Sequence, residues 1–144
     1  MGCYYSLLYK NNTFKNTPLW TLKGKKLKVK VLKVYDGDTI WIAIKLKGKI
    51  YRLKVRLLGI DTPEMKPPKS QKNREKEISE AKKAKEFLEN LVLNKVITIE
   101  CGDWDKYGRL LGTLYKNNFC GKININNLLL SEGLAKEYYG GTKN

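Results

Sequence analysis

Three segments in the first half of the chain alternate between apolar and polar residues, which is the pattern of half-buried strands. Residues 28–34 place Val29 and Val31 on one face with lysines between them, and residues 40–46 repeat the pattern with isoleucines. The third segment, residues 51–57, directs an apolar set inward and a basic set to the opposite, wet face (Tyr51, Leu53, Val55 and Leu57; Arg52, Lys54 and Arg56). Joined by a turn at Asp36-Gly37, the segments predict a three-stranded meander.

The second half of the chain changes to a helical period and then returns to strands. Residues 75–93 carry one apolar stripe at helical spacing: Ile78, Ala81, Ala84, Leu88, Leu91 and Val92. Residues 96–100 and 110–115 resemble strands, and residues 123–131 resemble a short helix that stops at Gly133. Five strands with one longer helix between the third and fourth predict an α+β, mainly β fold: a five-stranded OB-fold barrel with a short helix near its C-terminus.

Residues 1–26 lack a clean period, so we expect an N-terminal extension there and a single barrel domain over residues 27–144. A chain of 144 residues is long enough for one domain with a core. Its net charge of +15 is unusual, and residues 1–68 hold 15 Lys and Arg against 4 Asp and Glu. Such an excess favours a polyanionic partner, either nucleic acid or an anionic membrane surface. The alternative is a lysine-rich surface that only aids solubility.

The scarce residue types limit the chemistry further. The chain has no His, which excludes His acid–base catalysis and His-ligated metals. All five Asp lie in three short segments, at positions 36 and 38, 61, and 103 and 105. The three Cys form neither a disulfide framework nor a zinc spacing, and we interpret Cys101 and Cys120 as small core residues. No secretory signal is visible, so we expect an intracellular protein.

Four motifs follow one another in an order that carries a resemblance. They are Asp36-Gly37-Asp38-Thr39, the segment from Arg56 to Asp61-Thr62-Pro63-Glu64, Asp105-Lys106-Tyr107-Gly108-Arg109, and Gly133-Leu134-Ala135-Lys136 leading to Tyr138-Tyr139. In order and spacing they resemble the staphylococcal nuclease (thermonuclease) family, from about Lys28 to Tyr139. The second and third motifs are specific, whereas Asp-Gly-Asp alone would be weak.

The resemblance implies a metal site with one Ca²⁺ ion. Asp38 and Asp61 would be direct ligands, and the Thr62 carbonyl and water would complete the shell. An oxygen-only donor set suits a hard cation and offers nothing to a soft metal. Taken alone, Asp38 could equally be a turn or strand cap, and we interpret Asp36 as part of the hairpin turn.

The same resemblance assigns catalytic roles to three residues. Glu64 would orient or deprotonate the attacking water, although a Glu after Thr-Pro can also simply open a helical turn. Arg56 and Arg109 would stabilise the charge that develops on the phosphate oxygens, where the alternative is a strand arginine in a surface ion pair.

Substrate contacts come from the third and fourth motifs. The resemblance implies that Lys106 and Tyr107 contact a substrate phosphate and its nucleoside. Tyr139 would stack under the nucleotide, although Tyr138-Tyr139 could instead be a hydrophobic plug on the barrel.

The function implied is a Ca²⁺-dependent endo/exonuclease that cuts DNA and RNA with little sequence preference and leaves 3′-phosphate ends. We expect a monomer that prefers single-stranded or A·T-rich substrates. The alternatives are a non-catalytic nucleic-acid- or protein-binding module on the same fold, and a membrane-tethered adaptor.

Both ends of the sequence depart from the family pattern. Family members usually continue into a long C-terminal helix, whereas this sequence stops at Asn144 and has Gly141 where a second Tyr is common. We expect weaker substrate binding as a result. At the other end, Met1-Gly2-Cys3 and Ser6 match the pattern for N-myristoylation of Gly2 with palmitoylation of Cys3. Acylation there would place the protein on the cytoplasmic face of a membrane.

Overall fold

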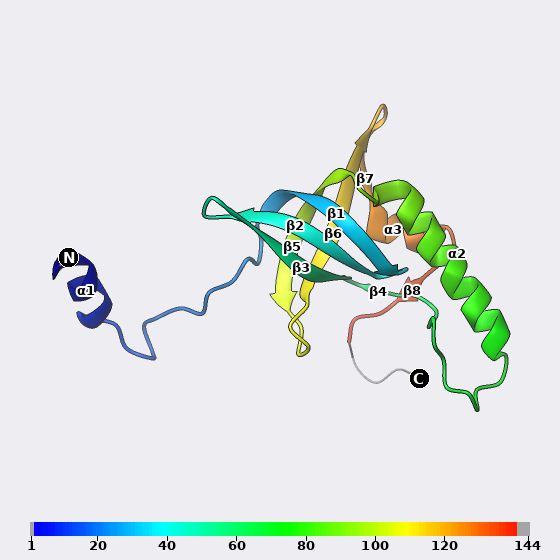
Figure 1. The fold of residues 1–144 in the computed structure, drawn as a ribbon, viewed down its shortest axis with the longest axis horizontal. Helices are drawn as coiled ribbons and strands as arrows, with labels where there is room; N and C mark the ends of the chain where they lie inside the picture. Colours follow the sequence, from blue (N-terminus) through cyan, green and yellow to red (C-terminus); the bar gives the residue numbers. More distant parts are fainter. Residues whose placement is uncertain (1, 141–144) are drawn as a thin grey trace.

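Five strands close into a barrel in the computed structural model, which describes the backbone of residues 2–140 and the side chains of residues 5–140 (Figure 1). The strands are β1 (Lys26–Asp36), β2 (Thr39–Leu46), β3 (Lys49–Leu57), β5 (Val96–Trp104) and β6 (Leu110–Asn118). The sheet runs in the order β3-β2-β1-β5-β6, and parallel pairing of β3 with β6 closes it. The predicted OB-fold barrel is confirmed.

The predicted meander is present, with strands a few residues longer than the alternation indicated. Val29 and Val31, the isoleucines of β2, and Val55 with Leu57 are buried in the core. The prediction for Tyr51 was wrong, because its side chain is 47% exposed. Tyr51 lies opposite Ile44, near the β2–β3 turn at the end of a hairpin that extends from the barrel (Figure 1).

Helix α2 (Arg74–Val92) packs against the barrel with the predicted stripe. Ala81, Ala84, Leu88 and Val92 are buried, whereas Ile78 and Leu91 at the edges of the stripe are only half-buried. Asn73, which precedes the helix, has a left-handed backbone with φ of 59°. Glu75 and Glu77 lie in the first turn, where the positive end of the helix dipole favours acidic side chains.

The C-terminal part of the chain is tied to the barrel by the predicted short helix and by short strands that the periodicity did not predict. Strand β7 (Gly121–Asn124) pairs antiparallel with β6, and helix α3 (Ile125–Ser131) follows β7. The buried Asn126 accepts a hydrogen bond from the Leu114 backbone N–H and donates to the Leu58 and Gly112 carbonyls. Strand β8 (Lys136–Glu137) then pairs with β4 (Ile60–Asp61), which follows β3 directly.

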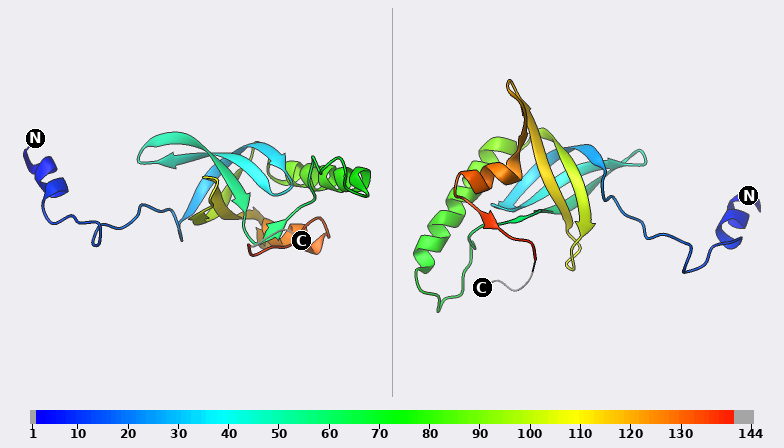
Figure 2. Two further views of the ribbon diagram at one scale, coloured as in Figure 1. Left: turned by 90° about the horizontal axis from the view of Figure 1, so that it is seen from below. Right: turned by 180° about the vertical axis from the view of Figure 1, so that it is seen from behind.

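The N-terminal region contains a short helix that the periodicity did not predict. Residues Gly2–Tyr9 form helix α1, which lies away from the barrel at the end of an extended segment in each view (Figures 1 and 2). Leu22, which precedes the predicted domain boundary at residue 27, is buried in the core. The Trp20 ring lies 6.2 Å from that of Trp104. In the described residues, no helix is both long and apolar enough to cross a bilayer.

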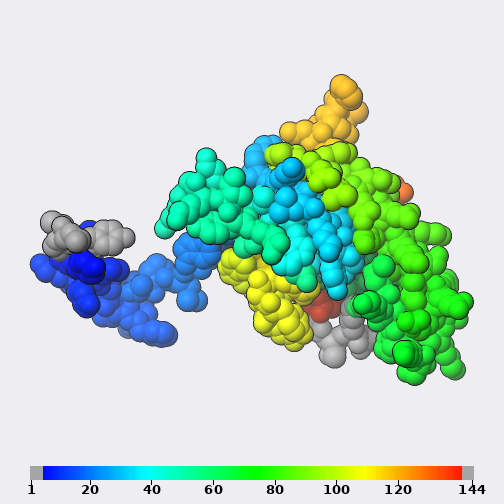
Figure 3. Space-filling model, in the orientation of Figure 1, coloured from blue at the N-terminus to red at the C-terminus, as the bar shows by residue number. Residues whose placement is uncertain are grey.

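The two cysteines with described side chains differ in burial. Cys101 is in the core, as expected, and burial raises the pKa of its thiol, an effect that the charge of Lys25 partly offsets. The prediction for Cys120 was wrong, because it is exposed at the β6–β7 turn. That turn protrudes from the barrel (orange in Figure 3), so its residues have no core to join.

Candidate functional site

The turn between β1 and β2 carries Asp38 into the interior of the molecule. Asp36 pairs with Thr39, so Gly37 and Asp38 form the turn itself. A Cβ on Gly37 would lie 2.8 Å from the Ala84 Cβ and 2.8 Å from the Thr62 Cγ2, closer than real contacts allow. Glycine is therefore required where the turn, the segment after β4 and helix α2 meet.

Asp38 is bonded to the segment that carries the second candidate carboxylate. Its Oδ2 accepts a hydrogen bond of 2.9 Å from the Thr62 backbone N–H, and its Oδ1 accepts one of 3.1 Å from the Thr39 hydroxyl. Asp38, Thr39, Asp61 and Thr62 are all buried polar residues. Residues from the β1–β2 turn and from β4, which the sequence separates by more than twenty positions, thus lie in direct contact.

The Arg56 guanidinium lies between the two carboxylates. Its Nη1 is 3.3 Å from Asp38 Oδ2, and its Nη2 is 3.1 Å from Asp61 Oδ1. Nη1 also donates to the carbonyls of Leu57 and Ile60. Only 12% of the Arg56 side chain is exposed, so these charged contacts are little screened by water. Arg56 thereby holds the end of β3 and the start of β4 together around the site.

Asp36 adds a third carboxylate, which the sequence analysis assigned only to the turn. Its Oδ1 accepts a hydrogen bond of 3.1 Å from the Asp38 backbone N–H. Burial, and then the charge of neighbouring Asp38, raise the pKa of Asp36 to about 7. Asp36 therefore lies beside Asp38, next to the two carboxylates that contact Arg56.

This donor set fits a hard cation. Carboxylate oxygens, which Ca²⁺ and Mg²⁺ prefer, outnumber the positive groups within the cluster. In residues 5–140 no three acidic, Cys or His side chains are grouped closely enough to hold a metal ion by themselves. A bound cation would need ligands beyond Asp38 and Asp61, such as a backbone carbonyl and water.

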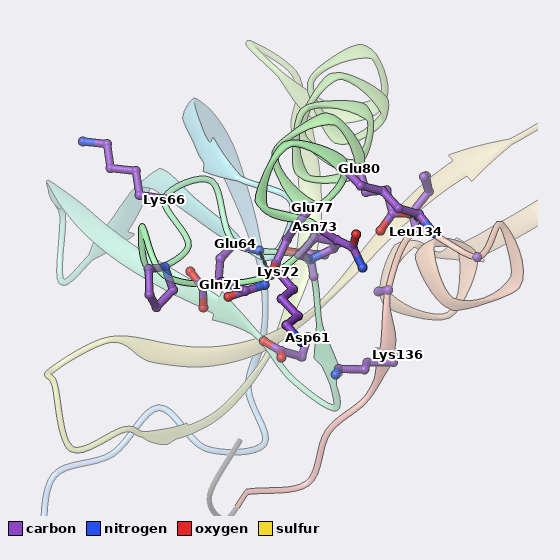
Figure 4. A pocket seen from close by; sticks show the side chains of 16 residues that line it. Asp61, Glu64, Lys66, Gln71, Lys72, Asn73, Glu77, Glu80, Leu134 and Lys136 are labelled. Carbon is purple, nitrogen blue, oxygen red and sulfur yellow. Dashed lines mark hydrogen bonds and ion pairs between the residues drawn. The ribbon is translucent and has the colours of Figure 1, made fainter. Parts of the chain in front are cut away.

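A groove of about 1030 Å³ opens beside Asp61 and Thr62 (Figure 4). The loop after β4, the start of α2 and the segment before β8 line it, and Glu64 lies on its wall. The Glu64 backbone N–H donates a hydrogen bond of 3.0 Å to Glu77 Oε1, and the Gln71 side-chain amide donates to Glu77 Oε2. Glu77, which the sequence analysis did not identify, therefore holds the Glu64 backbone from helix α2.

The fourth motif reaches the site through the pairing of β4 with β8. Asp61 pairs with Lys136, and both residues line the groove. The Tyr138 backbone N–H donates to the Gly59 carbonyl, and the Tyr138 ring centroid lies 6.0 Å from Arg56 Cζ. Tyr139 is 84% exposed. The sequence left open whether Tyr138 and Tyr139 form a hydrophobic plug on the barrel. The exposure of Tyr139 excludes that role for Tyr139.

The third motif lies on the loop between β5 and β6. Arg109 Nε donates a bond of 2.6 Å to Asp105 Oδ2, and Asp105 Oδ1 accepts from the backbone N–H groups of Tyr107 and Arg109. The Arg109 Cζ lies 5.4 Å from the Tyr107 ring, and Lys106 and Tyr107 are exposed. Asp105 thus directly orients Arg109.

The candidate residues therefore fall into three groups. Asp38, Arg56, Asp61 and Thr62 are in direct contact, and Glu64 lies next to them on the groove. Arg109, Lys106 and Tyr107 form a separate group, which the pairing of β3 with β6 places beside the strand of Arg56. Tyr139 follows β8. The side chains of Gly2 and Cys3 lie outside the described residues, as does Gly141.

Comparison with known proteins identifies a family and several relatives. Residues 54–144 match the family described as Staphylococcal nuclease homologue. The chain is 37% identical over 128 residues to an uncharacterized protein of Methanocaldococcus jannaschii, covering 76% of this chain and 58% of that protein. It is 27% identical over 119 residues to an uncharacterized endonuclease of Escherichia coli O157:H7, covering 83% of this chain and 66% of the relative.

A third relative, the protein ParB of Escherichia coli, is 27% identical over 127 residues, which cover 85% of this chain and 61% of ParB. The chain thus spans about three fifths of the length of the curated relatives that it matches. The family match covers well over half of the chain and includes Arg56, Asp61, Glu64 and Arg109. The chain belongs to the staphylococcal nuclease family.

Proposed function

We propose that this chain is a Ca²⁺-dependent nuclease that hydrolyses phosphodiester bonds of DNA and RNA with little sequence specificity. The observation that carries the proposal is the Arg56 guanidinium held between the buried carboxylates of Asp38 and Asp61, at the edge of an open groove that carries Glu64. The endonuclease name of one relative points the same way.

Asp38, Asp61 and the Thr62 carbonyl would hold the cation. When bound, Ca²⁺ supplies positive charge beside a phosphate oxygen and lowers the pKa of a bound water. Because the chain offers few ligands, positions stay open for a phosphate oxygen and water, and metal affinity should be modest.

Glu64 would orient the attacking water and accept its proton. The water oxygen then forms a bond to phosphorus while the bond from phosphorus to the 5′-oxygen breaks. The leaving 5′-oxygen takes a proton from water, because the chain has no His and an Arg does not give up its proton at working pH. The products are a 3′-phosphate end and a 5′-hydroxyl end.

Arg56 and Arg109 would bind the equatorial phosphate oxygens. A guanidinium is planar and permanently charged, so it can bind two oxygens at once and oppose the charge that develops in the transition state. Asp105 holds Arg109 through a hydrogen bond of 2.6 Å, which fixes the direction of its fork.

Lys106, Tyr107 and Tyr139 would contact the rest of the substrate. Both Tyr rings are largely exposed and can stack on any base, which fits a substrate range without sequence preference. Stacking needs an unpaired base, so single-stranded or A·T-rich DNA should be the better substrate. We also propose that the protein is monomeric and intracellular, and that acylation of Gly2 and Cys3 attaches it to a membrane.

Digestion of denatured DNA by the purified chain tests this function. The reaction is run in Ca²⁺, in EDTA, and with the variants Glu64→Ala and Glu86→Ala, the second being an exposed control on helix α2. We expect cleavage that needs Ca²⁺, leaves 3′-phosphates and falls by at least about a hundredfold in Glu64→Ala only. Wild-type protein that binds DNA without cutting it would instead establish a non-catalytic binding module.

A further inference from the structure

A cluster of aromatic and basic side chains lies on the outer face of the β1–β3 meander, outside the site described above. It consists of Tyr35 on β1, Trp41 on β2, and Arg52 and Lys54 on β3, which we term the meander patch. We propose that the meander patch binds single-stranded nucleic acid and continues the substrate path away from the catalytic site. The inference rests on the proposed function in so far as one strand would occupy both places.

Geometry brings the four side chains together. Trp41 pairs with Lys54 across β2 and β3, and Arg52 is two residues further along the same face of β3. The Lys54 Nζ lies 4.6 Å from the Tyr35 ring centroid and 5.6 Å from that of Trp41. The Arg52 Cζ lies 5.3 Å from the Trp41 centroid. Two rings and two cations therefore form one continuous surface.

The patch is open to solvent and positively charged. Tyr35 is 53% exposed, Arg52 is exposed, and Trp41 and Lys54 are half-exposed. In the described part of the chain, neither Arg52 nor Lys54 forms an ion pair, so no carboxylate neutralises them. Figure 3 shows the meander, in cyan and teal, uncovered between helix α2 and the N-terminal segment.

The patch is also continuous with the catalytic site. Arg52, Lys54 and Arg56 alternate along β3 and point to the same side of the strand, about 7 Å apart in succession. Arg56 is the member that reaches Asp38 and Asp61. A strand whose phosphate lies at Arg56 would therefore meet Lys54 and then Arg52 if it follows β3 outward.

The side chains favour nucleic acid as the occupant. Rings beside cations are what single-strand binding surfaces use, since bases stack on the rings and phosphates pair with the cations. Arg52 is one of only four arginines in a chain with 25 lysines, and its planar guanidinium can itself stack on a base. A membrane surface would require the charges but not the planar groups.

Binding of a fluorescent oligothymidylate of about 12 nucleotides, a length within the span of one OB fold, tests the proposal. Anisotropy is measured in EDTA, so that no cleavage occurs, for wild type, Arg52→Gln/Lys54→Gln and Trp41→Ala. The matched control is Lys82→Gln/Lys83→Gln, which removes the same charge from the exposed face of α2. Circular dichroism checks that each variant is folded, and the double variant keeps the test decisive if Trp41→Ala is not.

We expect Arg52→Gln/Lys54→Gln to lower affinity by at least about tenfold, and Trp41→Ala by at least about fivefold, both more than the control. Losing two phosphate contacts should also flatten the dependence of log affinity on log salt by about 1.4. Affinities equal to that of the control would overturn the proposal. So would variants that keep DNA binding but lose binding to phosphatidylserine vesicles, which would indicate a membrane surface.

The outcome is separable from that of the proposed function. If wild type never cuts DNA but its DNA binding depends on Trp41 and Arg52, the meander-patch proposal is supported and the nuclease proposal is wrong. If wild type cuts DNA in Ca²⁺ and the patch variants bind the oligonucleotide as tightly as the control does, the nuclease proposal is supported and the meander-patch proposal is wrong.

Discussion

The Glu77 carboxylate accepts a hydrogen bond of 3.0 Å from the Glu64 backbone N–H, and so ties the first turn of helix α2 to the loop after β4. Glu77 also accepts from the Gln71 side chain, so one carboxylate fixes two points of the same loop. The position of the proposed catalytic Glu64 therefore depends on a side chain of helix α2.

Replacing Glu77 should lower catalysis with little effect on substrate affinity. Hydrogen bonds to charged groups contribute about 1.5–3 kcal/mol, so Glu77→Ala should reduce kcat by roughly tenfold to a hundredfold with a smaller change in KM. Glu77→Gln keeps an acceptor for the Glu64 N–H and should retain more activity. Steady-state kinetics on denatured DNA, with Glu86→Ala as control, measures both; equal losses in the Glu77 and Glu86 variants would contradict the positioning role.

Arg56 should be as important for stability as for catalysis. Arg56→Ala leaves the buried carboxylates of Asp38 and Asp61 without their shared partner, which should cost about 3–5 kcal/mol in EDTA. Arg56→Lys keeps the positive charge but loses the planar fork of the guanidinium. Its free energy of unfolding should therefore lie between those of Arg56→Ala and wild type. Urea unfolding in EDTA gives these values.

Calcium should offset part of that loss, because a cation that binds only the folded protein stabilises it. At a hundred times its Kd the gain is about 2.7 kcal/mol. The gain should disappear in Asp38→Asn and Asp61→Asn but persist in Asp103→Asn, whose side chain is exposed near the end of β5. Equal Ca²⁺ stabilisation of the Asp61 and Asp103 variants would remove the metal site from this cluster.

Gly37→Ala should disturb the site through packing alone. The new Cβ would lie 2.8 Å from both Ala84 Cβ and Thr62 Cγ2, so the turn that carries Asp38 must move. We expect a loss of about 1–3 kcal/mol in the free energy of unfolding, typical of overpacking, together with reduced activity. Thr62→Ser removes one of the clashing atoms, so the double variant should recover part of the stability. An unchanged unfolding midpoint in Gly37→Ala would refute the close approach.

Asp105 should give the protein an acid-sensitive component of stability. Burial raises the pKa of Asp105, but hydrogen bonds from Arg109 and Tyr107 together outweigh it and hold the pKa below 3.8. Because the folded pKa is depressed, this stability is present above the unfolded pKa and is lost as pH falls through the folded pKa. Between about pH 5 and pH 2, Asp105→Asn should therefore lose less stability than wild type or Asp103→Asn. If stability fell with pH in parallel in Asp105→Asn and wild type, Asp105 would contribute nothing to the acid sensitivity of the fold.

The sequence was sufficient for elements whose burial follows a local period. Strands β1, β2 and β3 and helix α2 were predicted to within a few residues, because alternation and the 3.6-residue stripe both record which face is buried. The failures at Tyr51 and Cys120 share one cause. Both lie in or near hairpin turns, where the alternation of residue types no longer records which side chains the core covers.

The sequence identified the candidate residues that belong to a motif. It missed those whose role depends on a contact in the folded protein. Asp38, Arg56, Asp61 and Glu64 lie within short motifs, so residue type and spacing were enough to select them. Glu77 and Tyr138 carry no such signal: one is an ordinary acidic residue in the first turn of a helix, and the other was grouped with Tyr139. The raised pKa of Asp36 requires burial beside Asp38, which residue order does not express.

By itself, therefore, the sequence determined the order of the five barrel strands and of helices α2 and α3, the excess of positive charge and a chemistry without histidine, since each follows from residue type and local order. Only the tertiary structure decided that one guanidinium lies between two carboxylates and that helix α2 holds the Glu64 backbone. Those contacts join segments distant in the chain. The pairing of β2 with β3 places Asp38 beside Arg56, whereas the pairings of β3 with β6 and of β4 with β8 bring the third and fourth motifs near them.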